Sequence, residues 1–204
     1  KMIELMPGET MGYMGIGRNA NAQKRWDDAI KQFDYVTKLA NDYSSGYSFR
    51  AESYIGKEEW TEATDDIVKA LSLDWDRKAL YLANTLKEPA FTMLVSKIKV
   101  QSAKSPNEAT WPYITGTMYE QSKQYTKAIE YYETANSKDV SPVIHQRISE
   151  CHYELGDYED ALNSINQALN LDSTDLSYKA RKANIYYEMG NVKSAIAEWD
   201  NVLE

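Results

Sequence analysis

Residues 150–171, ECHYELGDYEDALNSINQALNL, decide the fold of this chain because their pattern returns with a period of about 34 residues. Gly156 recurs as Gly190, and Ala161 recurs as Ala195. A fixed period of this length is typical of stacked helical repeats, in which each unit buries its apolar face only against its neighbours. The sequence therefore predicts an all-α solenoid built from repeated helix–turn–helix units.

The same markers divide the rest of the chain. Ala29 recurs one period later as Ala63, whereas residues 77–105 keep two amphipathic segments but lose the glycine, alanine and aromatic markers. We interpret that stretch as a degenerate repeat. Pro7 and Gly8 are predicted to end a helix that belongs to a preceding repeat, so we expect the chain to be part of a longer array. The predicted units are 1–9 (the tail of a preceding repeat), 10–43, 44–76, 77–107 (degenerate), 108–141, 142–175 and 176–204.

Composition narrows the classes of function. The chain is 43% hydrophobic and 26% charged, which predicts a folded core. A formal net charge of −8 without a basic block argues against a nucleic-acid partner. The sequence contains no run of about 18 apolar residues, so it predicts no membrane-spanning segment. The single cysteine, Cys151, excludes an internal disulfide and leaves cytoplasmic and exported locations both open.

Two repeats carry the markers in one order: a small residue, a ring three residues on, glycine, a bulky residue, alanine and a further small or β-branched residue. They are Ser149, His152, Gly156, Tyr158, Ala161 and Ala168, and then Ala183, Tyr186, Gly190, Val192, Ala195 and Val202. This pattern resembles the tetratricopeptide repeat family. Glycine ends the first helix of such a repeat in the left-handed conformation. Lys24, Glu58 and Lys123 stand at that place in other repeats, which predicts looser turns there.

The resemblance implies a right-handed superhelix whose first helices line a concave groove for segments of other proteins. Carried over repeat by repeat, the expected binding residues are Arg18, Glu52, Tyr81, Asn84, Tyr113, Thr117, Glu120, Gln146, Glu150, Tyr153, Glu154, Asn184, Tyr187 and Glu188. Because the C-terminal half of this set is acidic and rich in tyrosine, we expect a neutral or basic protein or peptide as partner.

One subclass of the family grips acidic C-terminal tails with Lys, Asn and Arg side chains on successive first helices. The equivalent places in this chain read Met14/Arg18, Ser48/Glu52 and Tyr113/Thr117. The resemblance therefore does not extend to that clamp.

His145, Cys151 and His152 suggest a metal cluster, but His152 takes the place that Tyr186 takes one repeat later. A packing role explains these residues better, since zinc needs three or four converging ligands. No nucleophile–base pair, phosphate-binding glycine loop or metal-ligand spacing stands in the sequence. We therefore predict neither a cofactor nor a metal nor catalysis.

The sequence thus predicts a non-catalytic scaffold for protein–protein interaction, of unspecified oligomeric state. Two alternatives stay open. Trp75, between Asp74 and Asp76, could offer a stacking surface for carbohydrate in a cell-envelope scaffold. The repeats could instead position the substrate of a larger enzyme.

Overall fold

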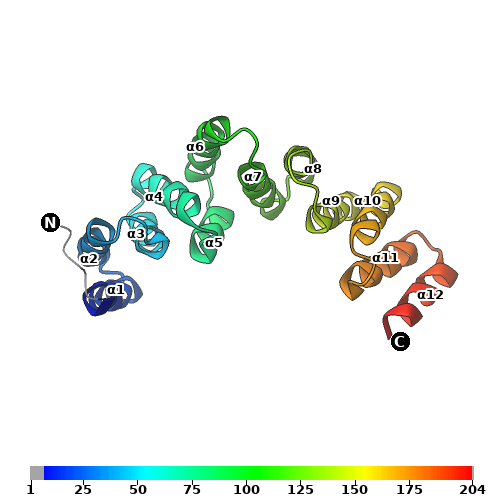
Figure 1. Cartoon of the computed structure of the whole chain (residues 1–204), viewed down its shortest axis with the longest axis horizontal. Coiled ribbons are helices and arrows are strands. Elements are labelled where there is room, and N and C mark those ends of the chain that lie inside the picture. The colour runs from blue at the N-terminus through cyan, green and yellow to red at the C-terminus, as the bar shows by residue number, and fades with distance from the viewer. Residues whose placement is uncertain (1–6, 204) are drawn as a thin grey trace. The chain divides into compact units, whose positions relative to one another are not determined.

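The computed structural model describes residues 7–203, which form twelve α-helices and no strand (Figure 1). The helices are α1 (Pro7–Ala22), α2 (Trp26–Leu39), α3 (Ser44–Gly56), α4 (Trp60–Leu73), α5 (Arg77–Thr85), α6 (Ala90–Lys104), α7 (Thr110–Gln121), α8 (Tyr125–Asn136), α9 (Pro142–Leu155), α10 (Tyr158–Leu171), α11 (Leu176–Glu188) and α12 (Val192–Leu203). The prediction of an all-α chain of helix–turn–helix units is confirmed.

The structure does not confirm the prediction for the N-terminal end of the chain. The expected helix tail falls on residues 1–6, which lie outside the described part of the chain. The expectation that Pro7 and Gly8 end a helix is wrong, because α1 begins at Pro7. The restricted φ of proline suits the first turn of a helix, where its missing N–H would have no partner anyway.

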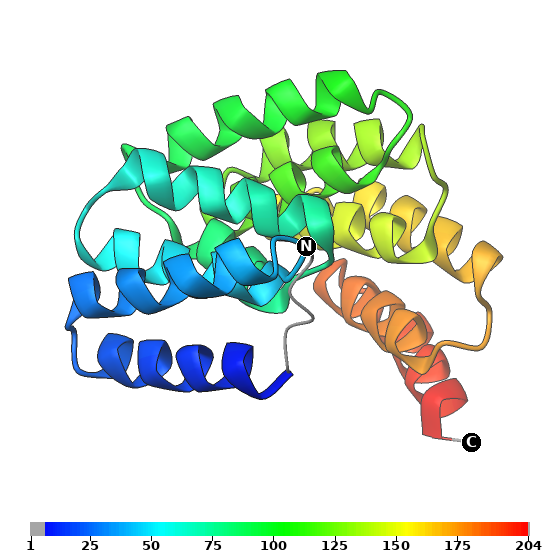
Figure 2. The same ribbon diagram turned by 60° about the vertical axis from the view of Figure 1, so that its left-hand side comes forward.

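The chain forms two compact units, unit 1 (residues 1–101) and unit 2 (residues 102–204). In unit 1, α2 packs between α1 and α3, α3 packs on α4, and α5 contacts both α3 and α4. In unit 2, each helix from α7 to α12 packs on the next one along the chain. Figure 2 shows the antiparallel arrangement of such a pair in α1 and α2. Neighbour-on-neighbour packing is what stacked repeats require; a single continuous array stays a prediction.

The degenerate repeat supplies α5 and α6. Its second helix joins α4 through Lys97, whose Nζ lies 2.6 Å from Oδ1 of Asp65 and 2.7 Å from the carbonyl oxygen of Thr61. One face of α6 carries the buried residues Ala90, Phe91, Leu94, Val95 and Ile98. The helical periodicity of this repeat therefore survives although its turn and packing markers are lost.

The turns within five of the helix pairs, all but α5–α6, share one conformation, with or without glycine. Lys24, Glu58 and Lys123 have φ values of 58°, 62° and 58°, in the same left-handed region as Gly156 at 83° and Gly190 at 76°. The hydrogen bonds also match: N–H of Lys123 and of Gly156 each donates to the carbonyl three residues back, at 2.9 and 3.0 Å. The expectation of looser turns is wrong. These turns keep the family geometry, and their side-chain-bearing residues carry the strain of the left-handed conformation.

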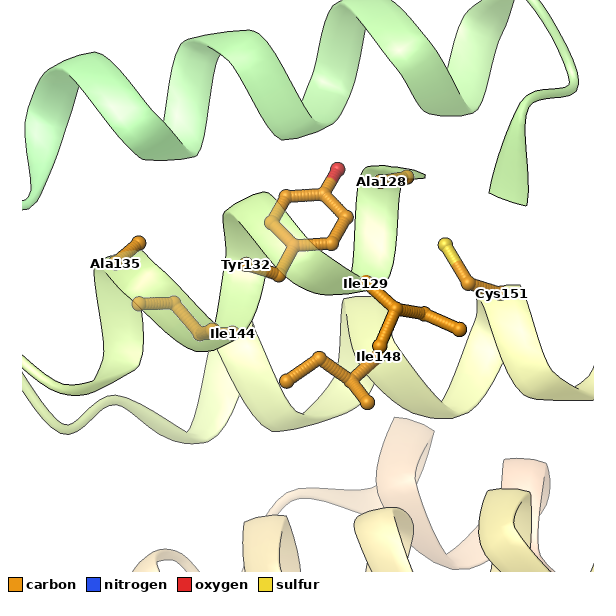
Figure 3. Packing of buried hydrophobic residues seen from close by; sticks show 7 residues of the cluster. All are labelled: Ala128, Ile129, Tyr132, Ala135, Ile144, Ile148 and Cys151. Atoms are coloured by element: carbon orange, nitrogen blue, oxygen red, sulfur yellow. The ribbon is translucent and has the colours of Figure 1, made fainter. Parts of the chain in front are cut away.

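A cluster in unit 2 shows how a second helix packs on the next repeat. It contains Ala128, Ile129, Tyr132 and Ala135 from α8 and Ile144, Ile148 and Cys151 from α9, and the ring of Tyr132 points away from α9 (Figure 3). Burial raises the pKa of the Cys151 thiol to about 12, with neighbouring carboxylates adding to the shift. The thiol is therefore a packing group rather than a nucleophile.

The two helices of a repeat approach each other most closely where a small residue on the first helix meets a larger one on the second. A Cβ atom at Gly17 would lie 2.6 Å from Cε1 of Phe33, and one at Gly116 would lie 2.6 Å from Cδ1 of Tyr132. Where the residue at the place of these rings is isoleucine, the small residue has a side chain: Ala51 corresponds to Ile67, and Ser149 to Ile165. Glycine is therefore required at positions 17 and 116, since the interior is close-packed there, whereas in the last repeat Ala183 corresponds to Trp199.

Strain at the turns can be measured with a pair of opposite changes. Glu58→Gly should raise the free energy of unfolding by about 0.5 kcal/mol, because relief of left-handed strain exceeds the added entropy of the unfolded chain. Gly156→Ala should lower the free energy of unfolding by about 1 kcal/mol, because it introduces the same strain. Urea unfolding followed by circular dichroism measures both. Equal midpoints for the two variants would contradict a shared left-handed turn.

Close packing can be tested within α1. Gly17→Ala should lower the free energy of unfolding by about 1 kcal/mol or more, because overpacking against Phe33 costs roughly 1–3 kcal/mol and exceeds the gain in helix propensity. Gly12→Ala is the matched control: a Cβ there meets nothing within 4 Å. It should raise the free energy of unfolding by about 0.5–1 kcal/mol. Phe33→Ile added to Gly17→Ala should cost less than the two single changes together; strict additivity would count against this contact.

Candidate functional site

A hollow of about 340 Å³ opens on the side of unit 2 where the first helices of three repeats supply its lining. Its residues are Glu120 and Gln121 from the end of α7, Lys123 and Tyr125 from the turn into α8, Glu150 and Glu154 from α9, and Arg181 from α11. We call this site the hollow. It lies on the helices that the resemblance assigned to the groove.

Three of the lining residues, Glu120, Glu150 and Arg181, belong to a network of ion pairs that also includes Arg147. Nη1 of Arg147 lies 3.3 Å from Oε1 of Glu120 and 3.1 Å from Oε2 of Glu150. Nη2 of Arg181 lies 3.1 Å from Oε1 of Glu150. The network therefore joins α7, α9 and α11, three successive first helices.

Neutral groups complete the hydrogen bonding of this network. The hydroxyl of Tyr132 donates to Oε2 of Glu120, and Nε2 of Gln146 donates to Oε1 of Glu150 at 3.1 Å. Burial opposes the charge of Arg147, but the carboxylates of Glu120 and Glu150 outweigh it and raise the pKa of the guanidinium above its usual value. The network keeps its charges, and two arginines balance two glutamates.

This balance corrects the acidic character that the sequence suggested for the C-terminal groove. Glu120 and Glu150 have side chains only 16% and 18% exposed, and both are paired with arginine. Arg147 and Arg181 were not among the residues predicted for the site. The sequence did indicate them, because Arg147 and Arg181 are 34 residues apart and therefore occupy equivalent positions in successive repeats.

Unit 1 has a related ion pair between its own first helices. Nζ of Lys78 on α5 lies 2.8 Å from Oε1 of Glu52 on α3, and Nδ2 of Asn21 donates to Oε2 of Glu52 at 2.9 Å. The cations of Lys78 and Arg18 lie 4.5 and 5.2 Å from the centre of the Phe49 ring. The predicted residues Arg18 and Glu52 are therefore held by contacts within unit 1.

Two tyrosines contact residues of the lining: Tyr125, which itself lines the hollow, and Tyr153. The hydroxyl of Tyr125 donates to Oε2 of Glu154 at 3.4 Å. The guanidinium of Arg181 lies over the ring of Tyr153, 5.5 Å from its centre. Partial burial and the carboxylate of Glu188 raise the pKa of Tyr153, so its phenol stays protonated. Glu154 and Tyr153 thus lie at or beside the site, together with Gln146.

The other predicted residues differ in access. Thr117 is buried, and its hydroxyl donates to the carbonyl of Ile114 at 2.8 Å, so we do not include it in the hollow. Tyr113 is half-buried with its ring 5.6 Å from that of Tyr132. Tyr187 is 55% exposed and its ring lies 5.9 Å from Trp199. The side chains of Asn184, Glu188 and Tyr81 are also exposed, whereas that of Asn84 is half-buried.

Other features of the chain bear on the alternative functions. Trp75 is 45% exposed in the loop between α4 and α5, and the carbohydrate-binding alternative stays a prediction. Across residues 7–203, no three side chains of His, Cys, Asp or Glu are placed to share a metal ion. No helix in the described part of the chain is long and apolar enough to cross a membrane.

Comparisons with known proteins agree with the repeat geometry. The family described as the fourth ARM domain of tetratricopeptide repeat protein 21 matches residues 114–202, somewhat less than half of the chain. A search of curated proteins found no match. Among solved structures, TTC0263, a thermophilic tetratricopeptide repeat protein of Thermus thermophilus, matches with a TM-score of 0.52 at 16% identity, covering 87% of this chain and 99% of that one.

A second solved structure is MamA of Desulfovibrio magneticus RS-1, from residue 41 to its end. It matches with a TM-score of 0.50 at 13% identity and covers 98% of this chain and 96% of that one. Identities this low establish the fold alone. Taken with the paired helices, the left-handed turns and the small residues at their crossings, they show that the chain has a fold similar to that of tetratricopeptide repeat proteins.

Proposed function

We propose that this chain is a non-catalytic scaffold that holds a segment of another protein in the hollow of unit 2. The observation that carries this proposal is that three successive first helices contribute side chains to one open site of about 340 Å³. A volume of this size accommodates a few side chains of a bound segment and leaves the segment free to continue past either edge.

The lining is suited to binding because several of its side chains are already held by ion pairs. Arg147 and Arg181 bond to carboxylates from two helices, so the lining side chains are held in place before any partner arrives. Pre-organisation of this kind lowers the entropic cost of association.

The lining also offers both donors and acceptors. Gln121 and Arg181 can donate hydrogen bonds, while Glu154 and the phenol oxygen of Tyr125 can accept them. An extended main chain presents N–H and C=O groups in alternation, so a mixed lining fits a peptide better than it fits an apolar ligand.

A matched pair of bulky substitutions tests the proposal. Peptides would be selected from a library of short random sequences displayed on phage, with the chain as bait, and the affinities of enriched peptides measured by fluorescence anisotropy. Gln121→Trp should weaken their binding at least tenfold, because the indole fills the hollow. Gln124→Trp, an exposed position on the same turn but outside the lining, should change it less than twofold.

Two results would overturn the proposal. One is a selection that enriches no peptide over the library background. The other is a set of peptides whose affinity is the same for both tryptophan variants, which would place their binding elsewhere on the chain.

A further inference from the structure

The charges of unit 2 point to the chemistry of the bound segment. We propose that the hollow receives a basic side chain, a lysine or arginine of the partner protein, against the carboxylate of Glu154 and the phenol of Tyr125. This inference rests on the proposed function and specifies its partner.

Net charge is distributed unevenly between the two units. Residues 102–204 contain 9 Lys and Arg against 16 Asp and Glu, a net charge of −7, whereas residues 1–101 contain 14 against 15, a net charge of −1. Seven of the eight net negative charges therefore lie in the unit that contains the hollow. A field of this sign attracts cationic segments and speeds their encounter with unit 2.

Within the hollow, the negative groups are not equivalent. Glu120 and Glu150 are each paired with arginine, but Glu154 is exposed and its hydrogen bond is the 3.4 Å contact from the Tyr125 hydroxyl. No ion pair of Glu154 exists within the described residues. Its carboxylate is therefore the one in the lining that can still take a cation without breaking a contact of the fold.

The chain contains an internal example of the proposed contact. Arg181 bonds to the carboxylate of Glu150 while its guanidinium lies 5.5 Å from the centre of the Tyr153 ring. Glu154 and Tyr125 present the same two groups, a carboxylate and a phenol, at the neighbouring place in the hollow. The ring of Tyr125 packs against the core cluster of unit 2, so a guanidinium or ammonium would bind here by a charge-assisted hydrogen bond to the carboxylate of Glu154, beside the Tyr125 hydroxyl.

Two cations in the lining, Arg181 and Lys123, repel a basic ligand and so oppose this contact. The charge of Arg181 is balanced by Glu150, so it adds little repulsion. Lys123 is exposed on the turn and lies at the edge of the hollow. Its ammonium should reduce the affinity for a basic ligand, which makes its removal a test of the sign of the preference.

The test uses three fluorescein-labelled probes, the peptides (Gly-Arg)4, (Gly-Gln)4 and (Gly-Glu)4, and measures their binding to the full chain by fluorescence anisotropy. The arginine peptide should bind, and its affinity should fall with added salt; the other two should bind at least tenfold more weakly. Glu154→Gln should weaken the arginine peptide about tenfold, because a charged hydrogen bond is lost. Lys123→Gln should strengthen it about twofold.

A matched control separates the hollow from the general charge of unit 2. Glu130→Gln removes the same charge from an exposed position on α8 outside the lining. It should change the affinity of the arginine peptide less than twofold. Equal losses for Glu154→Gln and Glu130→Gln, or tighter binding of (Gly-Glu)4 than of (Gly-Arg)4, would overturn the proposal.

Failure of this inference can be told from failure of the proposed function. Phage-selected peptides that lose affinity on Gln121→Trp but lack lysine and arginine would refute the basic partner and leave the binding role of the hollow intact. Selected peptides that are rich in basic residues yet indifferent to Gln121→Trp would refute both.

Discussion

The close approach of the two helices in the pairs α1–α2, α3–α4, α7–α8, α9–α10 and α11–α12 is the constraint on which the rest of this structure depends. Glycine at positions 17 and 116 lets the rings of Phe33 and Tyr132 lie directly against the backbone of the first helix. Alanine or serine serves where the facing residue is isoleucine. Because the distance between closely packed helices is set by these contacts, the first helix of each such pair presents the same face away from its partner. The face on which we propose binding is thus a consequence of core packing.

Ion pairs between consecutive first helices build on that arrangement. Glu52 with Lys78, Glu120 with Arg147 and Glu150 with Arg181 each connect one first helix to the next. Such partly buried pairs give little net stability, because desolvation offsets much of the attraction between the charges. Their geometric effect is larger, since they hold long side chains of neighbouring repeats in one conformation. In unit 2, this ordering holds the lining residues Glu120, Glu150 and Arg181 in contact with one another or with Arg147, and the network of two arginines and two glutamates has no net charge.

The parts of this structure that were predictable from sequence are those that repeat at a fixed interval. Gly156 and Gly190 with Ala161 and Ala195 were enough to predict the helix pairs, because one period constrains both backbone and packing. Lys123 misled the prediction of turn geometry: hydrogen bonds along the chain hold the left-handed conformation even when the residue there has a side chain.

The charge of the site was harder to predict, because it depends on pairing rather than on composition. Glu120 pairs with Arg147 and Glu150 with Arg181, and neither pair shares a helix, so counting glutamates on the groove face overstated its acidity. Only knowledge of which helices are adjacent shows that Glu154 differs from Glu120 and Glu150.

Lys123 links the strained turn to the site. At the equivalent place, Gly156 and Gly190 contribute no side chain, whereas Lys123 accepts a left-handed backbone that costs about 1–2 kcal/mol and lines the hollow. Strain retained beside a binding site is often connected with its function. A cation at the edge lowers the attraction of the hollow for diffuse positive charge, so under our proposal a basic ligand would need close contact with Glu154 to bind well. Lys123 would then sharpen selectivity at the expense of affinity, which is how specific sites commonly discriminate between related partners.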